Sequence, residues 1–217
     1  MPRERLTTGV RRDQITEATV AVLRERGVKG LSIAAVAHRV GLAPSALYRH
    51  FPSKDAMLDA VLDLMRERLH GAVALARSGT ADPLEALRQL LERHTALIRQ
   101  NQFLPRILLS DDYHVAHPER RQRLLGVFSG YLDGVAGIIR DGQGQGRIRS
   151  DVNARSLAIL FLGLIQPAGV LWTLSDGRFD VTRQAREAWN VYAQAIRAPG
   201  APAPPVARRA RRSAGRT

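Results

Sequence analysis

The sequence predicts an all-α protein of about nine helices. Apolar residues recur three and four positions apart through most of the chain, which is the period of a helix buried on one face. Ser, Asp or Pro precedes many of these segments and Gly often follows them, as helix starts and stops require. No segment shows the credible apolar–polar alternation typical of a β-strand.

The composition is that of an ordinary globular protein and excludes several kinds of site. The chain has 217 residues, enough for one or two domains with a sizeable core. Hydrophobic residues make up 45% and charged residues 24%, as in ordinary globular proteins. There is no cysteine, which excludes disulfides, thiolate metal sites and a cysteine nucleophile.

The first four helices have clear boundaries. The first is predicted by an apolar stripe and ends before Gly27; the stripe comprises Ile15, Ala18, Thr19, Val22 and Leu23. A second helix, 32–40, starts at the N-cap Ser32 and ends at Gly41. A short third helix, 44–50, starts with a proline. Ser53 caps the fourth, whose apolar stripe is Leu58, Val61, Leu62, Met65 and Leu69.

The middle helices follow the same rules. Asp82-Pro83-Leu84-Glu85 combines an N-cap, a first-turn proline and a capping-box glutamate, so a helix begins there. A short helical piece is expected at 104–109. Another helix begins near Pro118 and is expected to stop at Gly142, Gly144 and Gly146.

Two helices complete the ordered chain, one at about 153–175 and one at about 182–196. The first contains the longest apolar stretch, Leu157 to Trp172, which is too short to span a bilayer comfortably and is expected to be a core helix rather than a membrane segment. Pro167 should kink it. The N-terminus has no apolar core typical of an export signal, so we expect a cytoplasmic protein. Residues 198–217 are rich in Ala, Pro and Arg and are expected to be a disordered tail.

Basic charge suggests a polyanion partner. The formal net charge is +13, with ten basic and six acidic side chains in residues 1–60 and five arginines and no acid in residues 198–217. Nucleic acid is the leading candidate, because a basic segment attracts phosphates. The alternative is an ordinary solvated surface in a basic protein.

Catalysis and metal binding are disfavoured, and neither an enzyme nor a cofactor is expected. The chain has no nucleophile elbow, P-loop or HExxH motif. The glycines of 142–146 follow a helix rather than a strand, so a helix stop is favoured over a dinucleotide loop. Asp111, Asp112, His114 and His117 allow a metal site if helical, but Pro118 favours a loop and a helix start.

Residues 32–50 have helix-turn-helix spacing. Two short helices are separated by Gly41-Leu42-Ala43, with the glycine in the turn. The outward residues of the second helix are small, hydroxyl-bearing or cationic, as a helix in the major groove needs: Pro44, Ser45, Tyr48 and Arg49. A generic small helical bundle is the alternative reading of the spacing alone.

Residues 10–62 resemble the DNA-binding domain of TetR-family transcriptional regulators. The family signature Leu-Tyr-x-His-Phe, followed by x-x-Lys and an acid, stands here as 47–55, LYRHFPSKD. The earlier family pattern stands as Gly30-Leu31-Ser32-Ile33 through to Gly41-Leu42. Beyond residue 62 only the helical layout is similar to the family's ligand-binding and dimerising domain.

The resemblance implies a role for each matching residue. Tyr48, His50, Lys54 and Ser32 would contact backbone phosphates. Pro44, Ser45 and Arg49 would face base edges, although a phosphate contact from Arg49 stays open. Ala43 departs from the Ser or Thr of many members, which removes a side-chain cap and a polar DNA contact.

The sequence therefore predicts a DNA-binding domain at 10–60 and a regulatory, dimerising domain at 61–197. We expect a homodimer that binds a palindromic operator in double-stranded DNA, with the last two helices pairing between subunits through Ala158, Leu162, Ile165, Trp189 and Tyr192. The alternative for these five residues is that they fill the core of one subunit.

A small-molecule effector is expected to control DNA binding. The predicted pocket is mostly apolar and is lined by Met65, Leu69, Phe103, Leu104, Tyr113, Phe128, Phe161, Leu164, Gln166 and Trp172. A repressor released by a mostly apolar ligand is the leading hypothesis. The alternatives are that these residues only fill the core, and that the protein is an architectural DNA binder without ligand control.

Overall fold

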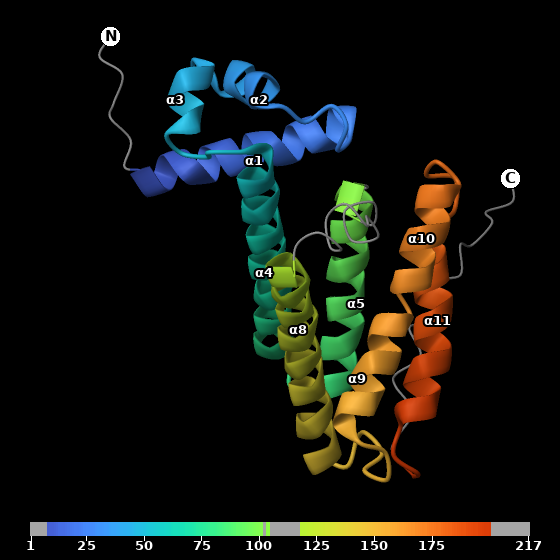
Figure 1. Cartoon of the computed structure of the whole chain (residues 1–217). Coiled ribbons are helices and arrows are strands. Elements are labelled where there is room, and N and C mark those ends of the chain that lie inside the picture. The colour runs from blue at the N-terminus through green and yellow to red at the C-terminus, as the bar shows by residue number, and fades with distance from the viewer. Residues whose placement is uncertain (1–7, 102, 105–117, 201–217) are drawn as a thin grey trace, which may run out of the picture.

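The computed structural model describes residues 8–101, 103–104 and 118–200. Within these ranges the chain is all-α, as predicted, and the only β-type pairing is an isolated bridge between Ile148 and Arg197. Figure 1 shows the helices, which are α1 (Thr8–Arg26), α2 (Ile33–Val40), α3 (Pro44–Tyr48), α4 (Lys54–Gly79), α5 (Pro83–Gln100), α8 (Pro118–Gly144), α9 (Ala154–Gly163), α10 (Gln166–Leu174) and α11 (Val181–Ile196).

The first three helices form a small unit at one end of the molecule. Figure 1 shows α1 lying across the ends of the longer helices, with α2 and α3 on its outer side. Ser32 caps α2 by accepting a hydrogen bond from the Ala35 amide at 3.1 Å, and Gly41 ends it at φ 67°. Ser53 caps α4 in the same way, through the Ala56 amide at 3.1 Å. These predicted boundaries are confirmed.

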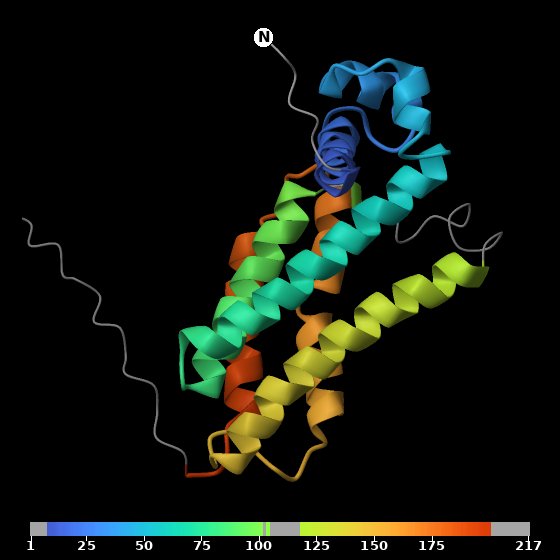
Figure 2. The ribbon, with the colours of Figure 1, turned by 90° about the vertical axis from the view of Figure 1, so that its left-hand side faces the viewer.

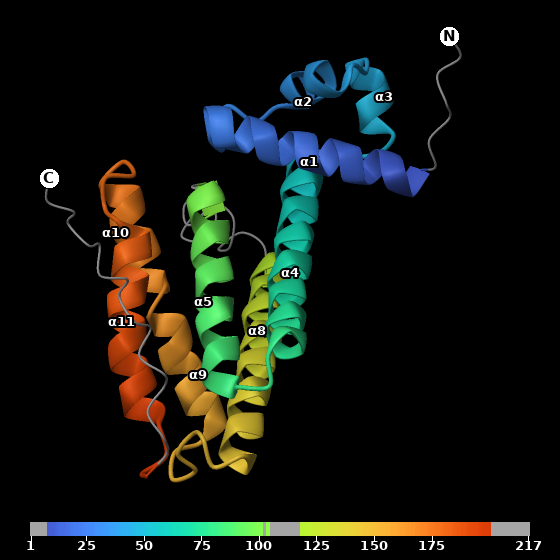
Figure 3. The same ribbon diagram turned by 180° about the vertical axis from the view of Figure 1, so that it is seen from behind.

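The remaining helices form an elongated bundle. α5 lies between the α4–α8 pair and the α10–α11 pair (Figures 1 and 3), and α4 and α8 run alongside each other below the N-terminal unit (Figure 2). The bundle has its own apolar core, whose largest fully buried side chains include Tyr131, Phe161, Leu87 and Leu90.

A second apolar core belongs to the N-terminal unit and extends beyond it. Its centre is formed by α1, α2, α3 and the first turns of α4, including Ile15, Leu47 and Phe51. Phe103 and Leu104, which follow α5 in the chain, are buried in the same cluster. α4 passes from this core into the bundle core, so one continuous helix joins the two.

At two predicted helix ends the structure differs from the prediction. Asp82 caps α5 through the Leu84 amide at 2.9 Å, but Glu85 does not complete a capping box and instead pairs with Arg88 at 2.6 Å. α8 continues through Gly142 to Gly144 instead of stopping at the first glycine. Gly142 is a packing residue, since a Cβ there would lie 2.6 Å from Cδ1 of Ile148.

The helix expected at 153–175 is two helices. α9 ends at Gly163 and α10 begins at Gln166, with Pro167 in its first turn. Proline lacks the amide hydrogen that would continue the hydrogen-bond ladder, so it interrupts the helix as expected. Residues Ala154–Leu174 are nevertheless long and apolar enough, by length and composition, to cross a membrane. In the fold, the inner face of this segment, including Phe161 and Ile165, lies in the bundle core.

Some sequence predictions concern residues outside the described ranges. These are the short helix at 104–109 beyond Leu104, the Asp111–His117 cluster and most of the Arg-rich tail. Ala198 is described, and its amide donates to the carbonyl of Arg147 at 3.2 Å.

Candidate DNA-binding face and ligand cavity

α3 presents one buried and one exposed face. Leu47 lies fully buried in the N-terminal core and holds α3 against its neighbours. The outward residues predicted from the sequence are exposed together, and the Tyr48 side chain is 54% exposed. They are Pro44, Ser45, Tyr48 and Arg49. As the family pattern suggested, Ala43 provides no side-chain cap. The helix thus offers a hydroxyl-rich, cationic surface of the kind that contacts DNA.

Arg12 of α1 holds His50 and Phe51, which follow α3, in place. Its guanidinium lies 4.3 Å from the centre of the Phe51 ring and donates a hydrogen bond to the carbonyl of His50. The Nδ1 atom of His50 is buried and has no hydrogen-bond partner among the described residues. Arg12 was not predicted from the sequence, because its partners lie 38 and 39 positions away.

Two predicted phosphate contacts also have structural roles. Nζ of Lys54 donates to the carbonyl of Val28 at 2.9 Å, which ties the start of α4 to the turn after α1. An ammonium has three donors, so two stay available for a phosphate. The Ser32 hydroxyl accepts from its cap partner and keeps its own hydrogen free to donate.

An apolar cavity of about 270 Å³ lies between α4, α5, α8 and α10. Five residues of the predicted pocket line it: Met65, Leu69, Leu104, Phe128 and Gln166. Further lining residues were not predicted from the sequence; they are Leu62, His94, Leu97, Ile98, Leu124, Val127, Gly169 and Val170. Most of them lie on the inner faces of amphipathic helices, where sequence alone does not separate cavity walls from packed core.

Other predicted pocket residues lie elsewhere, which corrects the prediction. Phe103 is packed in the N-terminal core, and Phe161 is fully buried in the bundle core. Trp172 is not among the residues that line the cavity; it lines a separate hollow near the end of α10, and its indole nitrogen donates to the carbonyl of Gly177 at 3.1 Å. Leu164 packs against the bundle core and is not among the cavity-lining residues. Tyr113 lies outside the described residues.

His94 is a polar but uncharged side chain in the wall of the cavity. Its Nδ1 lies 2.9 Å from the Tyr131 hydroxyl, and both side chains are buried. Burial lowers the pKa of His94 to about 4 and raises the pKa of Tyr131 above its ordinary value. Both are therefore neutral at pH 7. With Nδ1 engaged by Tyr131, Nε2 is the ring nitrogen left for a molecule in the cavity.

The cavity is physically joined to the DNA-binding unit. Leu62, Met65 and Leu104 line the cavity and also belong to the N-terminal core. A polar link lies beside them, where Arg24 of α1 donates through Nε and Nη2 to Oδ1 of Asn101, the residue that ends α5. A displacement of the cavity wall would therefore act directly on residues that contact α1 and α4.

Known protein families match both parts of the chain. The family described as "Bacterial regulatory proteins, tetR family" matches residues 15–61, and the family described as "YsiA-like protein, C-terminal region" matches residues 62–195. The chain belongs to the TetR family of transcriptional regulators. It is thus a DNA-binding regulator of the helix-turn-helix type. Among its relatives, SlmA is named a nucleoid occlusion factor and FadR a transcriptional regulator, and neither is named an enzyme.

Individual relatives are matched over nearly their whole length. The nucleoid occlusion factor SlmA of Vibrio vulnificus is 26% identical over 188 residues, covering 86% of this chain and 96% of the relative. The regulator FadR of Bacillus subtilis, solved in complex with stearoyl-CoA, has a TM-score of 0.69 at 21% identity, over 85% of this chain and 98% of that one. A regulator from Saccharomonospora viridis, solved with choline, has a TM-score of 0.76 at 22% identity, over 88% and 100%. At these identities the structures show the fold.

TetR-family regulators act as dimers. Of the dimer residues that the sequence predicted, Ala158, Ile165 and Tyr192 are buried in the subunit's own core, which agrees with the alternative that they fill the core. Leu162 and Trp189 are partly buried and pack against the same core. The exposed large apolar residues of α9, α10 and α11 are Ile159, Leu160, Leu171, Leu174 and Val191. After Ser156, α9 is apolar around its whole circumference, so periodicity could not show which face of that part turns outward.

The described residues of this TetR-family chain contain no group of three or more His, Cys, Asp or Glu side chains able to hold a metal ion. The Asp111–His117 cluster is outside that search.

Proposed function

We propose that the protein is a dimeric transcriptional repressor that binds a palindromic operator and is released from it by a small, mostly apolar molecule. The DNA-binding domain would be residues 10–60 and the regulatory domain residues 61–197. Such a repressor acts on chromosomal DNA in the cytoplasm. The Arg-rich segment 198–217 would add sequence-independent attraction to DNA.

The apolar cavity is the observation that carries this proposal. Among the described residues its walls are almost entirely aliphatic or aromatic, and the polar side chains that line it there are the neutral His94 and Gln166. A charged molecule would lose its hydration there without gaining an ionic partner, whereas an apolar molecule with one hydrogen-bonding group is compatible with the site. The ligand of the Bacillus subtilis regulator, stearoyl-CoA, carries a long apolar acyl chain, and this chain, not the charged coenzyme A group, is the part that supports an apolar occupant.

The shared walls suggest how the effector acts. A ligand that pushes on Leu62 or Met65 pushes on α4, which continues into the DNA-binding unit. Moving α4 changes the spacing of the two recognition helices in a dimer, and operators require a fixed half-site spacing. The ligand shifts the equilibrium only by its preference for the released state.

The second candidate is a DNA-binding protein without ligand control. The similarity to SlmA, named as a nucleoid occlusion factor, favours this function. The two candidates differ in what fills the cavity: a ligand-responsive repressor binds a small molecule there and loses DNA affinity, and an architectural protein does neither.

One experiment separates them. The operator is first selected from random DNA, and its affinity is then measured with and without a panel of uncharged apolar compounds. We expect at least one compound to lower the affinity of the wild type, and Val170→Phe, which fills the cavity, to abolish that response. The matched control is Leu125→Phe, on the exposed face of α8. A response unchanged by Val170→Phe contradicts the proposed site, and no response to any compound favours the architectural function.

A further inference from the structure

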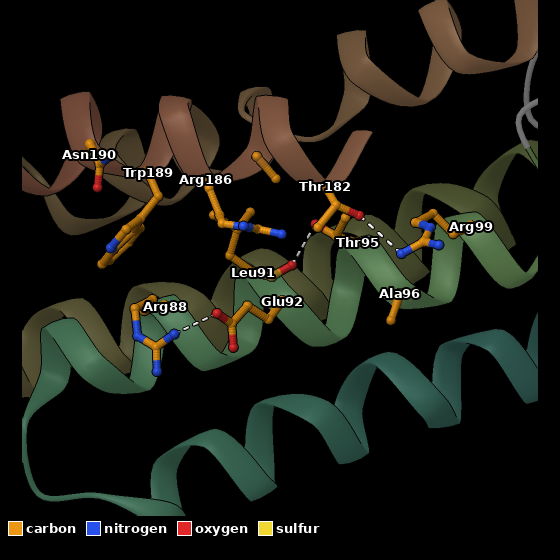
Figure 4. Close-up of a pocket in the computed structure, with 11 residues that line it drawn as sticks. Arg88, Leu91, Glu92, Thr95, Ala96, Arg99, Thr182, Arg186, Trp189 and Asn190 are labelled. Atoms are coloured by element: carbon orange, nitrogen blue, oxygen red, sulfur yellow. Dashed lines mark hydrogen bonds and ion pairs between the residues drawn. The ribbon is translucent and has the colours of Figure 1, made fainter. Parts of the chain in front are cut away.

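A groove separate from the cavity runs between α5 and α11. It has a volume of about 620 Å³ and is lined by Arg88, Leu91, Glu92, Thr95, Ala96, Arg99, Thr182, Ala185, Arg186, Trp189 and Asn190. Figure 4 shows Arg186 and Trp189 extending from α11 toward α5. A second hollow adjoins it near the end of α10 and shares Arg99 and Arg186 with it.

The groove has unbalanced positive charge. Arg99 donates to the Thr182 hydroxyl at 3.0 Å, and neither Arg99 nor Arg186 forms an ion pair within the described part of the chain. The carboxylate on the groove wall, Glu92, is already paired with Arg88 at 2.5 Å. Asp180 lines the adjoining hollow, where its Oδ1 accepts a hydrogen bond from the Arg183 amide, and it forms no ion pair with Arg99 or Arg186. Within the described part of the chain, two guanidinium groups thus face the same open space without an ion-paired carboxylate, which favours an anionic occupant.

The floor between these cations is apolar. Leu91 and Ala185 are buried beneath it, and the indole of Trp189 forms one side while remaining half-buried. The Thr95 hydroxyl donates to the carbonyl of Leu91 at 2.7 Å, so its hydrogen is already bonded without a ligand in the groove. A concave apolar surface with a few convergent polar groups is typical of small-molecule sites.

Neither the cavity nor the exposed apolar face accounts for this groove. On α5, His94, Leu97 and Ile98 turn to the cavity, whereas Thr95 and Arg99 turn to the groove. On α11, Val191 belongs to the exposed apolar face and lies about 140° around the helix from Arg186. A partner subunit that covers Val191 would therefore approach α11 from a different side of the helix than the one that carries Arg186.

We propose that this groove is a second small-molecule site, specific for an amphipathic anion. Its phosphate or carboxylate group lies between Arg99 and Arg186, where guanidinium groups form charge-assisted hydrogen bonds. Its apolar body lies on Leu91, Ala185 and Trp189. Phosphate and carboxylate share this chemistry, and the experiment distinguishes them.

Calorimetry on the full-length chain tests the site with octyl phosphate and octanoate, each compared with octanol and inorganic phosphate. We expect octyl phosphate, octanoate or both to bind with a stoichiometry of one per chain, and the stronger binder shows which anionic group the site prefers. Inorganic phosphate should bind more weakly because it lacks the apolar body. Octanol, which has no charge, should not bind in the groove. Arg186→Gln and Arg99→Gln should each weaken anion binding about tenfold or more. The matched control is Arg183→Gln, also on α11, whose charge is paired with Glu187 outside the groove; it should bind as the wild type does.

The cavity-filling variant Val170→Phe separates this site from the proposed effector cavity. Anion binding that survives Val170→Phe and is lost in Arg186→Gln supports the groove. Anion binding lost in Val170→Phe, or unchanged in both arginine variants, overturns the proposal. Saturable binding of a poly-glutamate peptide without binding of either octyl anion also overturns it, and makes the groove a docking surface for acidic peptides.

Discussion

Arg24 and Asn101 lie 77 positions apart in the sequence and are joined by two hydrogen bonds, at 3.3 and 3.0 Å, between the guanidinium of α1 and Oδ1 of the amide that ends α5. Asn101 is fully buried, and its Nδ2 donates to the carbonyl of Leu97 at 2.7 Å. Because Leu97 lines the cavity, this amide connects the cavity wall to the DNA-binding unit.

Replacing Arg24 by methionine should weaken that connection. The buried Oδ1 of Asn101 would lose both donors, and an unsatisfied buried acceptor costs about 1–3 kcal/mol. We expect urea unfolding to show this loss of stability and ligand titrations to show a smaller change in operator affinity. Arg26→Met, on the exposed side of α1, is the control. Equal stability of the two variants would show that the link is not important to the fold.

The phosphate contacts should differ in their effect on stability. Tyr48→Ala should weaken binding to all DNA sequences alike and leave the fold intact, because Tyr48 is exposed and phosphates carry no sequence information. Lys54→Ala should also lower the slope of log affinity against log salt by about one unit. In addition it should destabilise the protein, since it removes the bond to Val28.

These two variants are compared by salt-dependent binding assays and by thermal unfolding. A change in base preference without a loss of total affinity would contradict the phosphate roles. Lys29→Ala, an exposed lysine in the turn after α1, controls for the loss of one positive charge.

His94 should make stability depend on pH below neutrality. Its pKa is about 4 in the fold against an ordinary value of 6.5, so between these values the unfolded chain binds more protons. Stability therefore falls as pH decreases from 6.5 toward 4, with a slope on the order of 1 kcal/mol per pH unit. Unfolding curves at pH 7 and pH 5 measure this, and His94→Gln should show a smaller difference. An unchanged difference would assign the effect to other groups.

Two glycines of the same helix should respond oppositely to alanine. In Gly142→Ala the new Cβ would lie 2.6 Å from Cδ1 of Ile148 and 3.0 Å from Cβ of Pro83, so we expect a loss of about 1–3 kcal/mol. A Cβ added at Gly144 would have nothing within 4 Å, and alanine there should be neutral or stabilising by up to about 1 kcal/mol. Chemical denaturation of both variants measures the contrast, and equal effects would refute the packing role of Gly142.

The exposed apolar face should be the subunit interface. Leu160→Glu places a charge at a position that is 59% exposed in the single subunit, and it should convert a dimer to monomers without unfolding the chain. Leu75→Glu, also 59% exposed but on α4, is the matched control and should leave the mass unchanged. Light scattering reports the mass. A Leu160→Glu protein that stays dimeric would place the interface elsewhere.

The sequence by itself determined the features that depend on neighbouring residues. Ser32, Gly41 and Ser53 act within one turn of their own position, so the helix-turn-helix boundaries could be read directly. The outward residues of α3 followed from the same short spacing. Met65, Leu69 and Gln166, which the sequence placed in the predicted pocket, line the apolar cavity, and their role in binding a ligand stays a prediction.

Only the tertiary structure decided which faces of the long apolar helices meet. Ala158 and Ile159 are adjacent, yet one is buried in the core and the other is exposed, because the rotation of α9 about its axis depends on its packing against α8 and against Tyr192 of α11. In the same way Phe103 packs with α1 and α4 rather than in the cavity. The Arg24–Asn101 link and the groove at Arg99 and Arg186 join distant segments, so no local pattern in the sequence marks them.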